Sequence, residues 1–453
     1  MKALEYHEIT KHHPNRFAKS LGYLDWENQP LPYKTYKAPI LKLPKPTIKP
    51  LPYTALYSKN EFSPINIQNI SALLRYSAAI NAKKVYGPSS WYVRVNPSSG
   101  NLHPEEIYIF YKNSMYHFNP SVFALEEIAV SEEILVEDGI LIALTSIPLR
   151  ESWKYGERAL RYSLLDLGHL IAAIRFSSNL LGWEVEFDDI DLGFLFERFE
   201  GEEEFFEAAL KTKNAKININ AIKNLNPIKE YKPLAKEKVK WDVIYKTITN
   251  LKMKKEFNFT NTPIHFKPSP FNAYEIIDNR RSALGFIPSF LSKEDFFDIL
   301  DKTLQRNLPP FDVKITLNKV DFVIFVNRVD GIESGIYYFD RKNEKFSLIQ
   351  KGDFSTASKF INCNQDLGKD SAFTINMVAR IDDNEYKQSM IEAGMIGQVL
   401  YLEAEAKGIR GCGIGCFFDD LITKEILNDK SAIALYGFSI GAPLVDERII
   451  KLD

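Results

Sequence analysis

Residues 164–184 and 390–410 can be aligned without a gap, and this repeat constrains the fold more than any other feature of the sequence. Gly168 then matches Gly394, because 394 − 168 equals 226. Both stretches have apolar residues at three- and four-residue spacing and a glycine where a helix would end. We expect an internal duplication in which each stretch is the long, mostly buried central helix of its half.

The same offset of 226 relates two further patterns, at residues 65–78 and 291–304, that are typical of amphipathic helices. Ser292 stands where an N-cap is expected in the second of them. Strand, turn and strand patterns then follow in both halves, at 106–119 and 321–340. The order of elements is therefore the same in the two halves, and it predicts two tandem α+β units.

The halves differ at two places, and each lacks what the other has. The loop VNPSSGNLHP (95–104) precedes the strands of the first half; matching Ile107 to Phe322 gives an offset of 215, so the second half is 226 − 215 = 11 residues shorter there. Conversely, the segment 280–282, Arg-Arg-Ser, precedes the helix of the second half and has no counterpart in the first. The pattern suggests that the two halves share one site.

The length of 453 residues predicts two or three globular units. Residues 1–55 are rich in proline and polar residues and are expected to form an extended arm, and 211–270 a connector with one helix. This leaves 56–210 and 271–453 as the two domains.

Charge and composition exclude several classes of protein. The 57 Lys and Arg residues balance 59 Asp and Glu residues, which gives no electrostatic basis for binding nucleic acid. The first residues lack the apolar core of a signal peptide, and no stretch is long and apolar enough for a membrane span, so we expect a cytoplasmic protein. The three cysteines, Cys363, Cys412 and Cys416, are expected to be reduced thiols, and their spacing does not favour a metal site.

Four segments carry groups suited to chemistry, and each also has a simpler interpretation. The guanidinium groups in 280–282 could hold a phosphate or a carboxylate, or could be solvated surface. The loop 97–101 offers backbone N–H groups and side-chain donors to a hydrogen-bonding heterocycle, or is an ordinary turn. Lys154 and Tyr155 could act as acid and base if their pKa values were shifted, or could be surface side chains. The backbone of the glycine-rich segment 408–420 could run along a flat ligand, or the segment could be a turn that leaves the helix.

Taken in order, RVNPSSGNLHPEEIYIF, WKYGERALRYSLLDLGHL, EAGMIGQVLYLEAEAKGIRGCGIGCFFDD and ALYGFSIGAP resemble the SagB/ThcOx-type dehydrogenases of the nitroreductase superfamily in their tandem form. The resemblance implies an FMN-dependent oxidoreductase with two nitroreductase-like domains. Each would be a sheet flanked by helices, and their long central helices would form an intramolecular pseudo-dimer. It also explains the complementary losses, because one composite FMN site would remain per chain.

Carried over residue by residue, the resemblance implies a cofactor site drawn from both halves. Leu284 departs from the family pattern, which has a further arginine there. The residues expected to contact FMN are Pro97, Ser98, Ser99, Asn101, Arg280, Arg281, Ser282, Gly413, Ile414, Gly415 and Arg448.

Lys154 and Tyr155 match a Lys-Tyr pair associated with catalysis in relatives that oxidise azoline rings of a modified peptide to azoles. One of them would take the proton while the flavin accepts a hydride, and a cyclodehydratase would be a possible partner. Two other functions remain open: a flavin reductase of nitro compounds or quinones that uses a reduced nicotinamide, and a flavin-free scaffold or peptide-binding partner of a modification enzyme.

Overall fold

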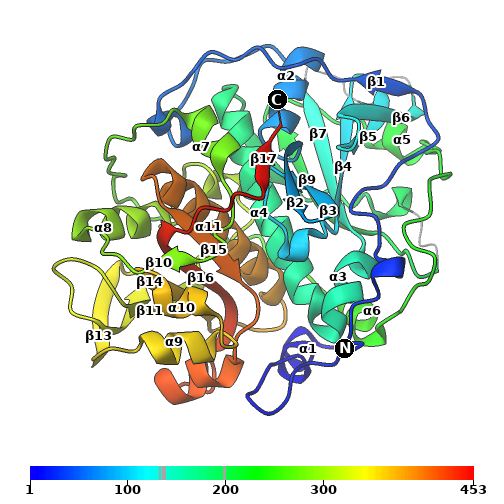
Figure 1. Cartoon of the computed structure of the whole chain (residues 1–453). Helices are drawn as coiled ribbons and strands as arrows, with labels where there is room; N and C mark the ends of the chain where they lie inside the picture. The colour runs from blue at the N-terminus through cyan, green and yellow to red at the C-terminus, as the bar shows by residue number, and fades with distance from the viewer. Residues whose placement is uncertain (132–133, 135–138, 197–199, 453) are drawn as a thin grey trace.

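Two long helices, α4 (Ala159–Leu180) and α11 (Tyr386–Ala406), pack against each other at the centre of the computed structural model (Figure 1). Both are buried along their whole length, and one continuous apolar core runs from the first half of the chain into the second. Gly182 and Gly408 follow the two helices in the left-handed region, with φ of 71° and 70°. The predicted pair of central helices is therefore confirmed.

The structure describes residues 1–131, 134, 139–196 and 200–452. No helix in these ranges is long and apolar enough to cross a membrane.

Each half contains an antiparallel sheet. The first has the order β1-β6-β5-β4-β7-β9-β8. The second has the order β10-β16-β14-β11-β12-β13, with β15 also paired to β16. The strands of the first sheet are β1 (Ile40–Lys42), β4 (Glu105–Tyr111), β5 (Ser114–Asn119), β6 (Ala124–Val130), β7 (Ile140–Ser146), β8 (Val185–Asp188) and β9 (Phe205–Thr212). Those of the second are β10 (Phe286–Ile287), β11 (Val320–Val326), β12 (Gly335–Asp340), β13 (Lys345–Lys351), β14 (Phe373–Ala379), β15 (Arg410–Ile414) and β16 (Ile433–Pro443).

The two sheets have the same topology. The path β6-β5-β4-β7-β9-β8 of the first half corresponds strand for strand to β13-β12-β11-β14-β16-β15 of the second. The amphipathic helices α2 (Ile67–Arg75) and α8 (Lys293–Lys302) also correspond, and the Ser292 hydroxyl caps α8 by accepting from the Asp295 N–H. The fold is thus two tandem α+β domains arranged as an internal pseudo-dimer.

Smaller helices connect these elements. One of them, α3, lies between β7 and α4 and has no helical counterpart between β14 and α11. These helices are α1 (Ala3–Ile9), η1 (Trp26–Asn28), η2 (Tyr53–Leu56), η3 (Ser99–Asn101), α3 (Pro148–Tyr155), η4 (Gly156–Arg158), η5 (Gly193–Leu195), α5 (Ile219–Lys223), α6 (Asp242–Ile248), α7 (Ala273–Asn279), η6 (Phe311–Val313), α9 (Ser355–Ile361), α10 (Asp366–Asp370) and η7 (Leu421–Ile426).

A third sheet joins the C-terminal strand to a hairpin of the first half. The C-terminal strand β17 (Ile449–Lys451) pairs with β2 (Ile80–Tyr86), which in turn pairs with β3 (Ser89–Arg94). Figure 1 shows this red C-terminal strand lying beside the blue hairpin of the first half. The last residues of the second half are thereby attached to the first.

The N-terminal segment differs from an extended arm at residues 3–9, which form α1. The prolines that exclude a continuous helix begin only at Pro14, so nothing prevents a helix before it. Residues 10–12, directly after α1, are buried, and Arg161 of α4 donates to the His7 carbonyl and to the Thr10 hydroxyl. The N-terminal residues are therefore part of the packing between the halves.

Candidate functional site

A cavity of about 340 Å³ lies between the two halves and is lined by residues of both. This volume is within the range of small-molecule sites, about 300–1,000 Å³. The first half contributes Pro97, Ser98, Ser99, Gly100, Tyr155, Tyr162, Asp166 and His169. The second contributes Ser282, Gln365, Tyr401, Cys412, Gly413, Ile414, Gly415, Cys416 and Tyr436. The cavity therefore brings together the loop and the arginine-serine segment that are each present in only one half.

Eight residues predicted from the sequence line this cavity. They are Pro97, Ser98, Ser99, Tyr155, Ser282, Gly413, Ile414 and Gly415. Five others, Lys154, Asn101, Arg280, Arg281 and Arg448, are not among the residues of its wall.

Hydrogen bonds to α4 and β3 hold the loop 97–101 in place. Ser99 donates its backbone N–H to Asp166 Oδ2 at 2.8 Å and its hydroxyl to Asp166 Oδ1 at 2.9 Å. Gly100 has a φ of 60°, which glycine adopts without strain. Asn101 donates its side-chain amide to the Tyr92 carbonyl at 2.8 Å, so this predicted cofactor contact fastens the loop to β3 instead.

The predicted catalytic pair approaches the same loop from α3. A Cβ atom built on Gly100 would lie 2.9 Å from the Tyr155 hydroxyl and 3.2 Å from Lys154 Nζ. Burial raises the pKa of Tyr155 well above its usual value, and the nearby Glu151 raises it further. The Tyr155 phenol therefore stays protonated and is suited to donating a hydrogen bond, not to acting as a base.

Arg280 and Arg281 are both buried, with 2% and 5% of their surface exposed. Arg280 Nε donates to the Val95 carbonyl at 2.7 Å, and its guanidinium stacks on the cavity residue Tyr401, 5.1 Å from the ring centre. Arg280 Nη1 and Arg281 Nε have no hydrogen-bond partner among the described residues. Neither guanidinium is ion-paired with a carboxylate in the described part of the chain, so both fit an anionic group such as a phosphate.

The segment 413–415 has little space for side chains. A Cβ on Gly413 would lie 1.9 Å from the Tyr436 hydroxyl, and one on Gly415 would lie 1.9 Å from Tyr162 Cε1. The Gly413 N–H donates to the Tyr401 hydroxyl at 2.9 Å. Glycine is thus required here by the two tyrosine rings, which sequence reasoning did not anticipate.

Arg448 lies outside the cavity wall. Its guanidinium pairs with Asp446, with Nε 2.6 Å from Oδ1, and stacks near Tyr86. The Arg448 guanidinium thus binds the carboxylate of Asp446, two residues earlier, and its predicted contact with the cofactor stays a prediction.

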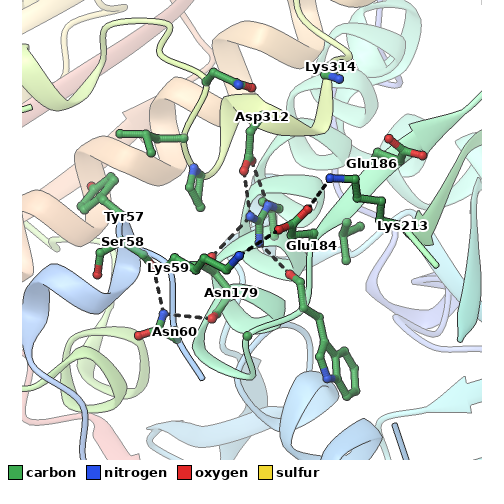
Figure 2. Close-up of a pocket in the computed structure, with 17 residues that line it drawn as sticks. Tyr57, Ser58, Lys59, Asn60, Asn179, Glu184, Glu186, Lys213, Asp312 and Lys314 are labelled. Atoms are coloured by element: carbon green, nitrogen blue, oxygen red, sulfur yellow. Dashed lines mark hydrogen bonds and ion pairs between the residues drawn. The ribbon is translucent and has the colours of Figure 1, made fainter. Parts of the chain in front are cut away.

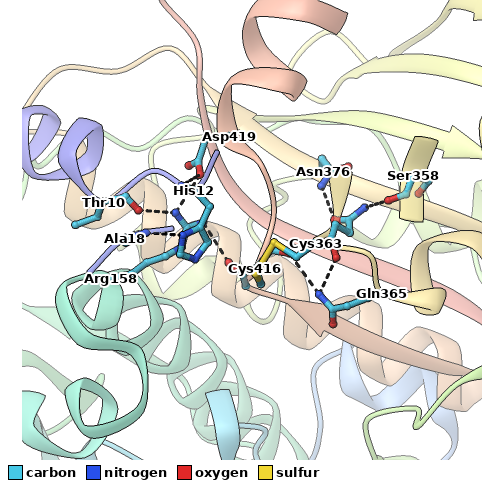
Figure 3. The surroundings of a disulfide bond; sticks show 12 residues. Thr10, His12, Ala18, Arg158, Ser358, Cys363, Gln365, Asn376, Cys416 and Asp419 are labelled. Atoms are coloured by element: carbon cyan, nitrogen blue, oxygen red, sulfur yellow. Dashed lines mark hydrogen bonds and ion pairs between the residues drawn. A yellow bond between two sulfur atoms is a disulfide. The ribbon is translucent and has the colours of Figure 1, made fainter. Parts of the chain in front are cut away.

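A disulfide joins Cys363 to Cys416, which contradicts the prediction of three reduced thiols (Figure 3). The Cα atoms are 5.8 Å apart although the residues are separated by 53 positions. The prediction failed because an odd, sparse cysteine count does not reveal that the strand after α11 returns to the end of α9. Cys416 and Gln365 both line the cavity, and Gln365 donates to the Cys416 carbonyl, so the disulfide fastens two parts of the wall together. Cys412 is a free thiol whose pKa burial raises to about 12.

A second pocket of about 280 Å³ is lined by residues of both halves (Figure 2). By the offset of 226, its residue Arg175 corresponds to Tyr401 of the first cavity, since 401 − 175 equals 226. Figure 2 shows Asp312 and the guanidinium that it binds at the middle of the pocket. Arg175 Nε and Nη2 donate to the two Asp312 oxygens at 2.8 and 2.7 Å. The position that corresponds to Tyr401 of the first cavity is thus occupied by an ion pair. The second half also lacks a counterpart of the loop 95–104 that lines the first cavity.

Sequence reasoning missed several residues of the cavity wall. Tyr162, Asp166 and His169 come from α4, and Tyr401 from α11. His169 shares hydrogen bonds with the Tyr436 hydroxyl at 3.0 Å and with Gln398 at 3.3 Å, and burial lowers its pKa to about 3. The available signal was that Asp166 and His169 interrupt the apolar stretch of α4 from Leu164 to Ile174.

The chain is similar in structure to a crystal structure of a protein from Anabaena variabilis assigned as a nitroreductase, with a TM-score of 0.73 and 23% identity, over 98% of this chain and 99% of that one. Two single-domain matches are more distant. A nitroreductase family protein of Clostridium novyi has a TM-score of 0.28 and 17% identity over 38% of this chain and 84% of its own. A chain of the E. coli microcin synthetase McbBCD complex has a TM-score of 0.31 and 13% identity over 41% of this chain and 79% of its own.

No protein-family model matches the sequence, and no curated protein matches it. The likeness to the Anabaena structure nevertheless covers 98% of this chain and therefore spans both halves. The chain therefore has the nitroreductase-like fold, in a tandem form that makes an internal pseudo-dimer.

Proposed function

We propose that this chain is an FMN-dependent oxidoreductase that binds one flavin in the cavity between its halves. The observation that supports this most strongly is the pair of buried guanidiniums, Arg280 and Arg281, with polar atoms that lack a partner next to that cavity. A flavin phosphate would supply the missing acceptors. The fold and the sequence resemblance point to the same cofactor.

In this proposal the two halves hold different parts of the cofactor. Arg280, Arg281 and Ser282 would contact its phosphate side, and the loop with Pro97, Ser98 and Ser99 would line its ring. When bound, FMN supplies hydride acceptance and donation. The chain itself contributes orientation through the fixed loop, and tyrosine hydroxyls held in their protonated form by burial.

The finer proposal is that the substrate is an azoline ring in a modified peptide, oxidised to an azole. It is supported by the Lys154-Tyr155 pair, which meets the loop at Gly100. Tyr155 would orient the substrate as a hydrogen-bond donor, because its raised pKa does not suit a base. The azoline would have to be made beforehand by a cyclodehydratase, the partner class that the resemblance implies.

Flavin binding is tested first. The purified protein should be yellow and release about one FMN per chain, and Arg280→Gln with Arg281→Gln should weaken FMN binding by roughly 10–100-fold for each charge-assisted bond lost. Arg380→Gln is the control, because Arg380 is 47% exposed and pairs with Asp429 on the surface. A colourless protein that binds no added FMN would contradict the proposal and favour a scaffold.

The substrate class is tested on the FMN-loaded protein. Lys154→Ala with Tyr155→Phe should reduce oxidation of a thiazoline peptide by roughly 10²-fold or more. The same variant should still reduce a nitro compound with a reduced nicotinamide if that reaction occurs at all. Equal loss of both activities, or unchanged thiazoline oxidation, would contradict the azoline assignment.

A further inference from the structure

Asp166 is the carboxylate in the wall of the cavity, and its surroundings are unusual. It belongs to the buried helix α4 and is 2% exposed. It accepts both the backbone N–H and the hydroxyl of Ser99, a residue that also lines the cavity. In the described part of the chain, no lysine or arginine forms an ion pair with it.

Two further buried carboxyl groups lie near Asp166, although Arg94 and Arg150 act on the first and Lys154 acts on the second. Glu105 of β4 is 2% exposed and Glu151 of α3 is fully buried. None of their four side-chain oxygens has a hydrogen-bond partner among the described residues. Burial raises the pKa of both groups well above the usual value, and the charge of Asp166 raises it further. Three adjacent buried carboxyl groups cannot all be ionised, so this cluster holds protons at neutral pH.

The second half of the chain provides a direct comparison. Glu392 occupies the position on α11 that corresponds to Asp166 on α4, since 392 − 166 equals 226. Its Oε1 is 2.7 Å from Arg341 Nη1, and it also accepts the Lys319 and Val320 N–H groups. In the second half, the carboxylate at this position accepts backbone hydrogen bonds, and an arginine neutralises its charge. Asp166 lacks such a partner, which a purely structural role does not explain.

The other titratable groups around the cavity do not accept protons at neutral pH. Burial raises the pKa of each tyrosine in the wall and of Cys412, and it lowers the pKa of His169 to about 3. Burial raises the pKa of Asp166 only to about 7, because hydrogen bonds from Ser98 and Ser99 oppose it. The groups that face Asp166 are Ser98 and Ser99 of the loop, Glu151, Lys154 and Tyr155 of α3, Glu105 of β4, Tyr162 and His169 of α4, and Tyr436 of β16.

We infer that Asp166 is the proton acceptor of the cavity and acts through the hydroxyl of Ser99. A proton leaves the bound molecule for Ser99 Oγ as the Ser99 hydroxyl proton moves to Asp166 Oδ1. Ser99 is unchanged at the end, and Asp166 has gained one proton. This inference rests on the proposed function, in which the hydride of the same oxidation goes to the flavin. Ser99 is thus the relay and Asp166 the acceptor, while the raised pKa values of Glu105 and Glu151 keep these two neighbours protonated.

The first test uses the flavin-free protein and needs no substrate. Infrared difference spectra from about pH 5 to about pH 9 should show buried carboxyl groups titrating near neutrality. Glu405 is a second carboxyl whose pKa burial raises to about 7, so Glu405→Gln serves as the matched control. We expect Asp166→Asn to remove one titration and Glu405→Gln to remove another. A spectrum of Asp166→Asn equal to that of the unmodified chain would overturn the inference.

The second test is the pH profile of thiazoline oxidation by the FMN-loaded protein. Asp166→Asn should lower the rate by roughly 10²–10⁴-fold and abolish the ionisation near neutrality. Ser99→Ala should slow the reaction but keep that ionisation, and Asp166→Glu should restore part of the rate. An unchanged pH–rate profile in Asp166→Asn would refute the relay. A protein that binds no FMN would instead refute the proposed function, and the infrared titration of the flavin-free protein would then test Asp166 by itself.

Discussion

Gly168 and Gly394 lie against each other where α4 crosses α11. A Cβ on Gly168 would be 2.2 Å from the Ile391 carbonyl oxygen, and one on Gly394 would be 2.1 Å from the Leu165 carbonyl oxygen. Because 391 − 165 also equals 226, the two contacts are related by the pseudo-two-fold symmetry of the halves. Such self-complementary pairing is the property of a two-fold dimer interface, here made within one chain.

Gly168→Ala should destabilise the protein although alanine favours helices. Helix propensity alone would stabilise α4 by about 1 kcal/mol, whereas the added methyl group meets backbone and should cost about 1–3 kcal/mol or more net. Urea unfolding measures the difference. Gly193→Ala is the control, since a Cβ there would approach only the movable Asp191 carboxylate at 3.0 Å. A stabilised Gly168→Ala would mean that the helices do not cross in this way.

Asp419 should be essential for joining the N-terminal segment to both halves. It accepts Arg158 Nη1 at 3.0 Å and Arg161 Nη1 at 2.6 Å, and the His12 N–H at 3.0 Å. Asp419→Ala would leave two buried guanidiniums without a carboxylate and should cost about 3–5 kcal/mol of unfolding free energy. Asp420→Ala is the control, because the Asp420 side chain is 19% exposed and its partner Lys11 keeps a second carboxylate, Glu8. Its loss should cost about 1 kcal/mol or less.

The same carboxylate should make stability depend on pH. Burial acts to raise the pKa of Asp419, but Arg158 and Arg161 outweigh it and hold the pKa well below its usual value. Its contribution is therefore fully present above the unfolded pKa of about 4 and is lost as the pH falls further. Thermal unfolding between about pH 2 and about pH 6 should show a steeper acid loss in the unmodified chain than in Asp419→Asn.

The disulfide should stabilise the fold and the cavity wall. It closes a segment of 53 residues, for which chain entropy gives at most about 4 kcal/mol. Unfolded, unreduced protein should expose one thiol, Cys412, and reduced protein three. Cys363→Ser should lower the melting temperature, and a reductant should have no further effect on that variant. Three thiols without reductant would show that the bond does not form.

Local patterns predicted the duplication well because helix periodicity and end signals are local. The match of Gly168 to Gly394 gave α4 and α11, and Ser292 gave the start of α8. Pairings over long sequence distances were not visible. A three-residue strand such as β17 has no pattern of its own, and only the folded chain reveals that it pairs with β2.

The candidate site was predicted in part for the same reason. The loop with Ser99 and the segment with Ser282 were found because one half lacks each of them. Asp166 was missed because its closeness to Ser99, 67 residues earlier, depends on how the loop packs on α4. Arg280 was expected to contact the cofactor; its Nε is bonded to the Val95 carbonyl, and its Nη1 is without a partner among the described residues.

One flavin per chain should bind even if the second pocket is emptied. Arg175 and Asp312 occupy the position related by the pseudo-two-fold axis, and the second half is 11 residues shorter where the loop would be. Asp312→Ala should destabilise the protein, because it leaves Arg175 buried without its carboxylate. Its FMN content, measured by absorbance after denaturation, should stay at about one per chain. Two FMN per chain would show that the ion pair alone blocks a second site.

Asp166 should weaken the fold as it ionises. Burial raises its folded pKa to about 7, above the unfolded value of 3.8, so the folded state binds the proton more tightly. The resulting stabilisation is fully present below the unfolded pKa and is lost as the pH rises through about 7. Asp166→Asn cannot ionise and should therefore gain stability relative to the unmodified chain as the pH rises from about 4 to about 8. Urea unfolding at several pH values measures this, with Glu405→Gln as a control that removes a different carboxyl whose pKa is also raised to about 7. A constant difference between Asp166→Asn and the unmodified chain across this range would mean that folding does not raise the pKa of Asp166, and the carboxyl would then not titrate near neutrality.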